Sequence, residues 1–272
     1  MPGWRYGAGI VPAMTTHDYL ASLFSLQGRT AVVTGGSSGI GRAIAEALAQ
    51  AGAHTVLVAR GADRLDEVAA GLRERGCAVE TVVADLSSRD GIHTAADGIA
   101  AAAGEPDVIV NSAGINLRPH LGEVDEAIWD VTMTVNLEAP FLLGQRFAPG
   151  MAERGFGRLI HISSQQAHRS FVDSGAYGVS KGGLESLARS QSEAWSSRGV
   201  TANTLVPGFV LTPLNQRLQD DTERVGALAA RTTVGRNGVP EDFAGAAVFL
   251  ASASSGYVTG HSLFVDGGFS VH

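Results

Sequence analysis

The chain has 272 residues, a formal net charge of −7, 44% hydrophobic residues and 17% charged residues. This composition excludes a disordered chain, and the length is sufficient to bury a full core within one large domain. The negative charge argues against a general nucleic-acid or anionic-membrane surface. A phosphate-bearing ligand therefore needs backbone amides or a few well-placed arginines.

The sequence carries no sign of secretion, membrane insertion or disulfide formation. Cys77 is the single cysteine, so an internal disulfide and a thiolate metal cluster are both excluded. No apolar run is long enough to span a bilayer, and residues 1–30 lack the apolar stretch of a signal peptide. We therefore predict a cytoplasmic protein without a metal site, in which residues 1–22 form a disordered N-terminal extension.

Short β-branched runs alternate with amphipathic stretches along the chain. The predicted strands are residues 30–34, 54–59, 78–84, 107–111, 158–163, 201–206 and 262–265. The predicted helices are residues 40–51, 63–75, 89–103, 125–154 (bent near Pro140), 176–197 and 240–251. Apolar strands that alternate with helices are typical of a parallel sheet covered on both faces. We predict a single α/β domain over residues 23–272, a doubly wound Rossmann-type parallel sheet of about seven strands.

One connection, residues 208–238, is polar, irregular in pattern and too long for an ordinary loop. We interpret it as a mobile lid over a ligand site.

The first strand is joined to the first helix by a glycine-rich turn, residues 34–41 (TGGSSGIG). Glycines let the backbone approach a pyrophosphate, whose charge is favoured by free amides at a helix N-terminus. The turn and its position predict a dinucleotide site.

The end of the second strand distinguishes between the two nicotinamide dinucleotides. NAD-preferring enzymes usually place a carboxylate there, whereas this chain has Ala59 followed by Arg60. A guanidinium can bind a ribose 2′-phosphate bidentately, so the sequence favours NADP(H) over NAD(H). The alternative is that Arg60 is a solvated loop residue.

Tyr177 and Lys181 lie four residues apart near the start of a predicted helix, so both project from one face. A phenol is a poor base at neutral pH, but an adjacent ammonium favours the phenolate and makes Tyr177 a usable acid or base. Such a pair is common on helix surfaces and predicts little by itself.

Other segments of the sequence make a catalytic role for Tyr177 and Lys181 more specific. They are the glycine turn, Asp85, the run Asn111–Gly114 (NSAG), Asn136, and Ser163-Ser164 at the end of a strand. Together with Tyr177 and Lys181 they resemble the short-chain dehydrogenase/reductase family, in order and spacing, from about Leu23 to Gly268. Ser112 is a small departure, because the family more often has asparagine there.

The resemblance implies a role for each catalytic candidate. Tyr177 would be the acid/base, Ser164 would hydrogen-bond the substrate oxygen, and Lys181 would bind the nicotinamide ribose. Asn136 would anchor a water in the proton relay behind that lysine. These residues imply hydride transfer between a nicotinamide cofactor and a secondary alcohol or ketone.

The resemblance also implies a cofactor site built from several segments. Its expected residues are Gly35, Ser37, Ser38, Gly39, Ile40, Gly41, Arg60, Asp85, Leu86, Asn111, Ala113, Gly114, Tyr177, Lys181, Pro207, Gly208, Val210 and Thr212.

The substrate is less well defined. Residues 23–29, residues 114–118 and Trp195 resemble gluconate 5-dehydrogenases and deoxygluconate dehydrogenases. That likeness implies a sugar acid, with Ser164 and Tyr177 at its reacting carbon and Arg118 near its carboxylate. The alternative for Arg118 is a solvated loop residue. His120 and His168 lie in loops that border the pocket, and the mechanism needs neither.

Two other functions remain open. A 3-oxoacyl-thioester reductase shares almost every motif, but a carrier-protein partner would need a basic patch, and only Arg118, Arg169 and Arg217 are scattered locally. A non-catalytic nucleotide-binding sensor or scaffold would be expected to lack the catalytic tyrosine or lysine. The resemblance further implies a homotetramer that binds a small-molecule substrate and neither nucleic acid nor membrane.

Overall fold

The computed structural model describes residues 15–216 and 220–271, which form one sheet with helices on both faces. All seven strands are parallel, in the order β3-β2-β1-β4-β5-β6-β7. They are β1 (Thr30–Thr34), β2 (His54–Ala59), β3 (Val79–Val83), β4 (Val108–Asn111), β5 (Gly157–Ile162), β6 (Val200–Pro207) and β7 (Ser262–Val265). The doubly wound Rossmann-type sheet expected from the sequence is confirmed.

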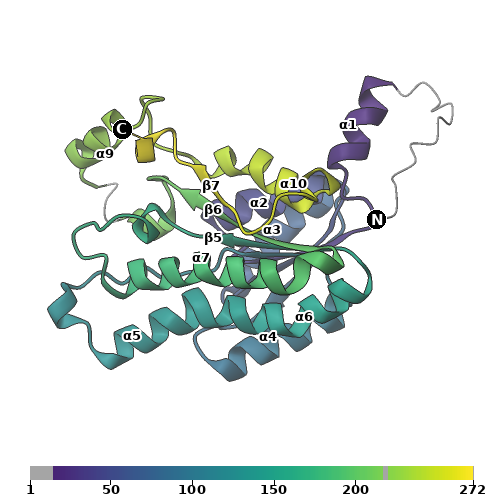
Figure 1. The fold of residues 1–272 in the computed structure, drawn as a ribbon, viewed down its shortest axis with the longest axis horizontal. Helices are drawn as coiled ribbons and strands as arrows, with labels where there is room; N and C mark the ends of the chain where they lie inside the picture. The colour runs from purple at the N-terminus through teal and green to yellow at the C-terminus, as the bar shows by residue number, and fades with distance from the viewer. Residues whose placement is uncertain (1–14, 217–219, 272) are drawn as a thin grey trace, which may run out of the picture.

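The helices form two layers (Figure 1). One face of the sheet carries α2 (Gly39–Gln50), α3 (Ala62–Glu74) and α10 (Ala244–Ala251). The other face carries α4 (Arg89–Ala103), α5 (Glu126–Met133), α6 (Ala139–Glu153) and α7 (Gly175–Trp195). None of the helices in the described part of the chain is both long and apolar enough to cross a membrane.

The strands are apolar on both sides because each face of the sheet has its own core. In β1, Val33 packs against α2 and α10 in one cluster, whereas its neighbour Val32 packs in the cluster of α4 and α6. Both side chains are fully buried, as the two-residue period of a strand between two helical layers requires.

The N-terminal prediction is wrong in part. Residues 16–22, expected to be disordered, belong to helix α1 (Thr16–Phe24). Thr15 and Asp18 form a capping box at its start, and the Ser254 hydroxyl donates a hydrogen bond to the Leu23 carbonyl. Residues 1–14 lie outside the described residues.

The long predicted helix 125–154 is interrupted. Between α5 and α6 the chain makes a π-helical turn, Thr134–Glu138, and the structure places Asn136 in this turn. Pro140 follows in the first turn of α6, directly after Ala139, whose N–H donates to the Thr134 carbonyl and closes the π turn. The bend expected near Pro140 is therefore a local change of helix type, which is frequent at functional sites.

Residues 208–238 are more regular than the sequence predicts. They contain a 3-10 turn, Pro213–Asn215, and the helix α9 (Thr222–Ala230), whose N-cap is Asp221. Figure 1 shows α9 beside the C-terminal end of the chain, and the Thr233 hydroxyl donates a hydrogen bond to the Gly267 carbonyl. That this segment moves as a lid remains a prediction.

Candidate active site

Two adjoining cavities lie at the carboxyl ends of the strands, on either side of the point where the strand order reverses between β1 and β4. In doubly wound sheets this crevice is where ligands bind. One cavity, of ≈ 420 Å³, contains Tyr177, and the other, of ≈ 710 Å³, contains Arg60. Both are lined by Gly35, Ser38, Ala113 and Gly114, so they form one continuous groove of the kind an elongated ligand needs.

The glycine turn fits a dinucleotide. Gly35 has φ +70°, and a Cβ added there would lie 2.8 Å from the Ala113 nitrogen. Gly39 also has a positive φ, of +53°, which L-residues rarely adopt. Ser38, the N-cap of α2, makes no side-chain capping bond, so it leaves the first amides of this helix to a phosphate.

The lining of the second cavity suits the adenosine of a dinucleotide that carries a 2′-phosphate. Ala59 and Arg60 line it together with Asp85 and Leu86, as expected from the sequence. Arg64, from the first turn of α3, also lines it and was not anticipated. Asp63, beside Arg64, lines the cavity too, but the residue that ends β2 is Ala59 and not a carboxylate, and the two arginines suit a 2′-phosphate.

Asn111 does not line either cavity, and its expected contact with the cofactor remains a prediction. It ends the buried strand β4 and points toward β5, where its Nδ2 donates a hydrogen bond to Nδ1 of His161 at 3.0 Å. Nε2 of His161 donates in turn to Oε1 of Gln191 at 2.8 Å. Burial lowers the pKa of His161 to about 4, so the ring is neutral and Asn111 belongs to a structural network.

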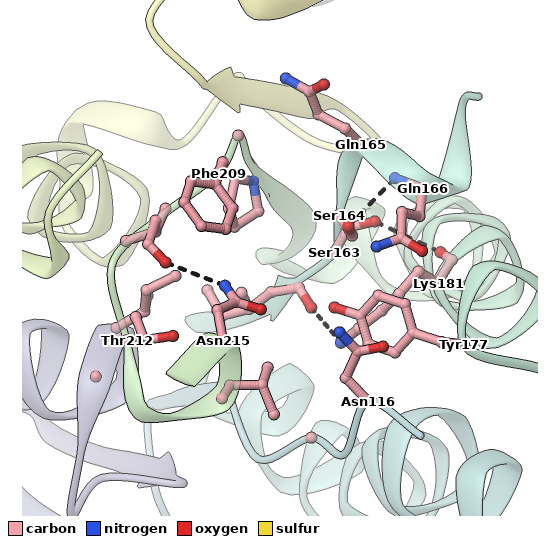
Figure 2. Close-up of a pocket in the computed structure, with 18 of the residues that line it drawn as sticks. Asn116, Ser163, Ser164, Gln165, Gln166, Tyr177, Lys181, Phe209, Thr212 and Asn215 are labelled. Atoms are coloured by element: carbon pink, nitrogen blue, oxygen red, sulfur yellow. Dashed lines mark hydrogen bonds between the residues drawn. The ribbon is translucent and has the colours of Figure 1, made fainter. Parts of the chain in front are cut away.

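Three of the predicted catalytic residues converge on the first cavity. Tyr177 and Lys181 come from the first two turns of α7, and Ser164 follows β5 (Figure 2). The Lys181 ammonium donates a hydrogen bond to the Ile162 carbonyl at 2.7 Å and lies 5.6 Å from the centre of the Tyr177 ring. Ile40, Gly41, Pro207, Gly208, Val210 and Thr212 line the same cavity.

Burial dominates the electrostatics of the two central groups. It raises the pKa of Tyr177 above its usual value, while a hydrogen bond with Ser164 and the charge of Arg118 lower it. Burial also lowers the pKa of Lys181 to about 8. Arg118 therefore adds positive charge that favours the Tyr177 phenolate. That Lys181 has the same effect, as the sequence predicts, remains a prediction.

Asn136 lies behind the cavity, with its side chain engaged by the backbone of Ile115. Its Oδ1 accepts a hydrogen bond from the Ile115 nitrogen at 2.9 Å, and its Nδ2 donates to the Ile115 carbonyl and the Ser180 hydroxyl at 3.0 and 3.1 Å. A Cβ added to Gly114 would lie 3.3 Å from Asn136 Oδ1 and 3.7 Å from Lys181 Nζ. The π-helical turn therefore fixes the loop after β4 beside Lys181.

Arg118 lines the cavity, and its guanidinium donates hydrogen bonds to the carbonyls of Val172 and Asp173. Burial lowers the pKa of Arg118, the charge of Arg224, from α9, lowers it further, and the charges of Asp173 and Tyr177 act in the opposite direction. Two guanidinium groups thus share one cavity, and within the described residues no carboxylate lies within ion-pair distance of either.

Several lining residues were not anticipated. The polar ones are Asn116, Gln165, Gln166, Asn215 and Arg224. The apolar ones are Phe171, Phe209, Leu214, Leu228 and Phe269. Asn116, Gln165 and Gln166 adjoin residues that the sequence identified, so proximity along the chain was an available signal. Phe209, Leu214, Asn215, Arg224 and Leu228 belong to the segment 208–238, which the sequence predicts to lie over the site, whereas nothing local marks Phe171 and Phe269.

Three loop residues lie outside the cavities. His120 accepts a hydrogen bond from the Gly122 nitrogen, His168 pairs with Glu185, and Arg169 donates to the Ser270 carbonyl. Arg217 lies outside the described residues. Among the residues that the structure places, no group of three or more His, Cys, Asp or Glu side chains could hold a metal ion.

Comparison with known proteins decides the family. A family model described as "Enoyl-(Acyl carrier protein) reductase" matches residues 35–270. Gluconate 5-dehydrogenase of Gluconobacter oxydans is 38% identical over 92% of this chain and 97% of that protein. The chain belongs to the short-chain dehydrogenase/reductase family. It is therefore an oxidoreductase that uses a nicotinamide cofactor.

Solved structures of the family agree in fold over nearly the whole chain. Gluconate 5-dehydrogenase of Burkholderia cenocepacia J2315, in complex with NADP and tartrate, is 36% identical with a TM-score of 0.88, covering 93% of this chain and 99% of that one. A protein of Beutenbergia cavernae, assigned provisionally as an NAD(P)-dependent gluconate 5-dehydrogenase and holding NADP at low occupancy, is 42% identical with a TM-score of 0.88. The match covers 92% of this chain and 99% of that one.

Replacing Lys181 with methionine should stabilise the protein while it abolishes turnover. Because the folded pKa is about 8 and the unfolded pKa 10.5, folding disfavours the ammonium below pH 8, by about 3 kcal/mol as an upper estimate. The unfolded chain binds more protons between these two values, so wild-type stability should rise toward that of Lys181→Met from pH 8 to 10.5. Urea unfolding of both proteins from pH 6 to 10.5 measures the difference; a wild type that is the more stable of the two at pH 7 contradicts it.

Proposed function

We propose that this enzyme interconverts a secondary alcohol and a ketone on a hydroxylated carboxylic acid, a sugar acid such as gluconate or a ketogluconate, with NADP(H). The observation that carries the proposal is the Arg118–Arg224 guanidinium pair in the cavity of Tyr177. Two like charges in one cavity repel each other, and a substrate carboxylate would relieve that repulsion. The sugar-acid names of the family relatives support the same class.

In this proposal the chain's residues divide the chemistry at the substrate oxygen. Ser164 donates a hydrogen bond to that oxygen and Tyr177 transfers a proton to or from it. Lys181 binds the nicotinamide ribose and adds positive charge beside the phenol, while Asn136 supports the relay behind Lys181. When bound, the cofactor supplies or accepts the hydride.

The direction of proton transfer follows from the surroundings of Tyr177. Burial keeps the phenol protonated, which is the state that reduction of a carbonyl needs. Oxidation of an alcohol needs the phenolate, which the Ser164 hydrogen bond and the Arg118 charge both favour. Nearby positive charge therefore assists oxidation, and burial assists reduction.

Removing the hydroxyl in Tyr177→Phe should lower kcat by several orders of magnitude, because the phenol is the group that exchanges a proton with the substrate oxygen. Cofactor affinity should change little, since the ring and Lys181 remain. Steady-state turnover and a fluorescence titration with NADPH measure the two effects. Near-normal turnover in this variant rules out the acid/base role.

The cofactor preference rests on the second cavity. We assign the adenosine end to Arg60, Asp85 and Leu86, and the nicotinamide end to Pro207, Gly208, Val210 and Thr212. The glycine turn with Ala113 and Gly114 lies between these two ends and would hold the pyrophosphate. The arginines at the end of β2 favour NADP(H) over NAD(H), and the NADP-bound relatives support this preference.

Replacing Arg60 with glutamine should weaken NADPH binding by about tenfold to hundredfold, because a charge-assisted hydrogen bond to the 2′-phosphate is lost. NADH binding should stay within about twofold. Calorimetry with both cofactors tests this, with Arg75→Gln as control, since Arg75 lies outside the cavity. Tighter binding of NADH than of NADPH by the wild type refutes the preference.

The substrate class is tested by activity. The wild type should turn over gluconate with NADP, or a 5-ketogluconate with NADPH, at a kcat/KM at least about tenfold above that for an acetoacetyl thioester. Arg224→Gln should raise KM for the sugar acid about tenfold and leave that for a polyol unchanged. Arg224 is preferable to Arg118 here, because Arg118 also holds the Val172–Asp173 backbone.

The exposed Arg189, on α7 outside the cavity, provides the matched control Arg189→Gln. Faster reduction of the thioester than of the keto acid would favour the alternative, a 3-oxoacyl-thioester reductase. The apolar lining residues Phe171, Phe209 and Leu228 are compatible with an acyl chain.

We propose a homotetramer in the cytoplasm. The exposed apolar side chains of Trp129, Phe141 and Val179, on α5, α6 and α7, support burial between subunits. The single free cysteine, Cys77, is compatible with a reducing compartment.

A further inference from the structure

The first cavity holds amide carbonyl oxygens that lack a hydrogen-bond donor. Asn116 Oδ1 and Gln166 Oε1 are buried and have no partner among the described residues. Figure 2 shows both amides on the wall that carries Tyr177 and Ser164. Gln165 Oε1 is also unpaired, but its Nε2 donates to Asp266, and its amide lies apart from Tyr177 in the figure.

Asn215 provides a third acceptor, on the opposite wall. Its Nδ2 donates a hydrogen bond to the Val210 carbonyl at 3.0 Å, which fixes the orientation of the amide. Figure 2 shows the remaining oxygen directed toward the middle of the cavity, across from Tyr177. A backbone hydrogen bond from the Asn215 nitrogen to the Thr212 carbonyl at 2.9 Å holds this turn in place.

A buried acceptor without a donor costs about 1–3 kcal/mol, so such atoms are rare unless a ligand or water supplies the donor. Here two such atoms and a third oriented acceptor lie around one phenol. A hydroxyl supplies the donor they need, whereas an acyl chain has none to offer. Acceptors on both walls suit a chain that carries hydroxyls on both sides of its reacting carbon.

We propose that Asn116, Gln166 and Asn215 form a hydroxyl-recognition set, which selects substrates with hydroxyl groups on carbons neighbouring the one that reacts at Tyr177. This inference rests on the proposed function, because it specifies the part of the sugar acid that the two arginines do not contact. The carboxylate and the hydroxyls would then be recognised by separate groups: guanidinium at one end and amides around the reacting carbon.

The test uses two carboxylic acids that differ only in hydroxyl groups. Gluconate and 5-hydroxyhexanoate share a six-carbon chain, a carboxylate and a secondary alcohol at C5, but 5-hydroxyhexanoate lacks the other hydroxyls. The wild type should prefer gluconate strongly in kcat/KM. The variants Asn116→Leu, Gln166→Met and Asn215→Leu should each lower this preference about tenfold, by slowing gluconate and not 5-hydroxyhexanoate.

Gln50→Met, an exposed substitution of the same type on α2 and outside the cavity, serves as the control and should change neither rate. Thermal unfolding with and without NADP confirms that each variant is folded and binds its cofactor. Equal losses of kcat/KM for both acids would assign these amides to structure. A raised KM for NADP with an unchanged preference would assign them to the cofactor. Either result overturns the inference.

The two proposals fail in different ways. If the wild type oxidises gluconate but the variants keep the full preference, only the hydroxyl-recognition set is wrong. If the wild type oxidises neither acid, the sugar-acid proposal fails, and D-glucitol with 2-hexanol repeats the comparison without a carboxylate. Loss of a glucitol preference in the variants then supports the set by itself, and a wild type inactive on both pairs refutes it.

Discussion

The fold depends on one constraint of a parallel sheet: all strands run in the same direction, and the inner strands are buried on both faces. Parallel strands bring all their carboxyl ends to one edge, and the reversal of strand order between β1 and β4 opens a crevice at that edge. The glycine turn after β1, the loop after β4 and Ser164 after β5 meet there for this reason. Helical layers on both faces keep the crevice in place.

Burial of the two ionisable catalytic groups lowers the stability of the folded chain. A lysine and a tyrosine that are almost fully buried both have pKa values shifted against their charged forms, and the Lys181 ammonium has a single backbone carbonyl as its hydrogen-bond partner. Neutral groups surround them, such as the hydrogen-bonded Asn111–His161–Gln191 network of the neighbouring strands and α7. Stability is thus exchanged for two ionisable groups held where they can react.

The cavity divides into two kinds of chemistry. Around Tyr177 and Ser164 lie amide groups, and two arginines, Arg118 and Arg224, line the same cavity without an ion pair to any carboxylate of the described residues. Apolar side chains, Phe209 and Phe269 among them, line other parts of the cavity. The strands and α7 supply the common chemistry of the family, while the loops and α9 supply the groups that can distinguish one substrate from another.

The sequence by itself determined the seven strands, the glycine turn and the Ser164, Tyr177 and Lys181 candidates, because apolar periodicity and short turns are local properties. It also placed α4 and β7 at their observed ends. Only the tertiary structure decided the rest. The direction of the Asn111 side chain depends on β5, and Asn215, Arg224 and Phe269 come from segments distant from Tyr177 to line its cavity. Contacts between remote segments produce no periodic pattern in the sequence. The sequence therefore predicts the reaction, whereas packing brings together the residues that can distinguish substrates.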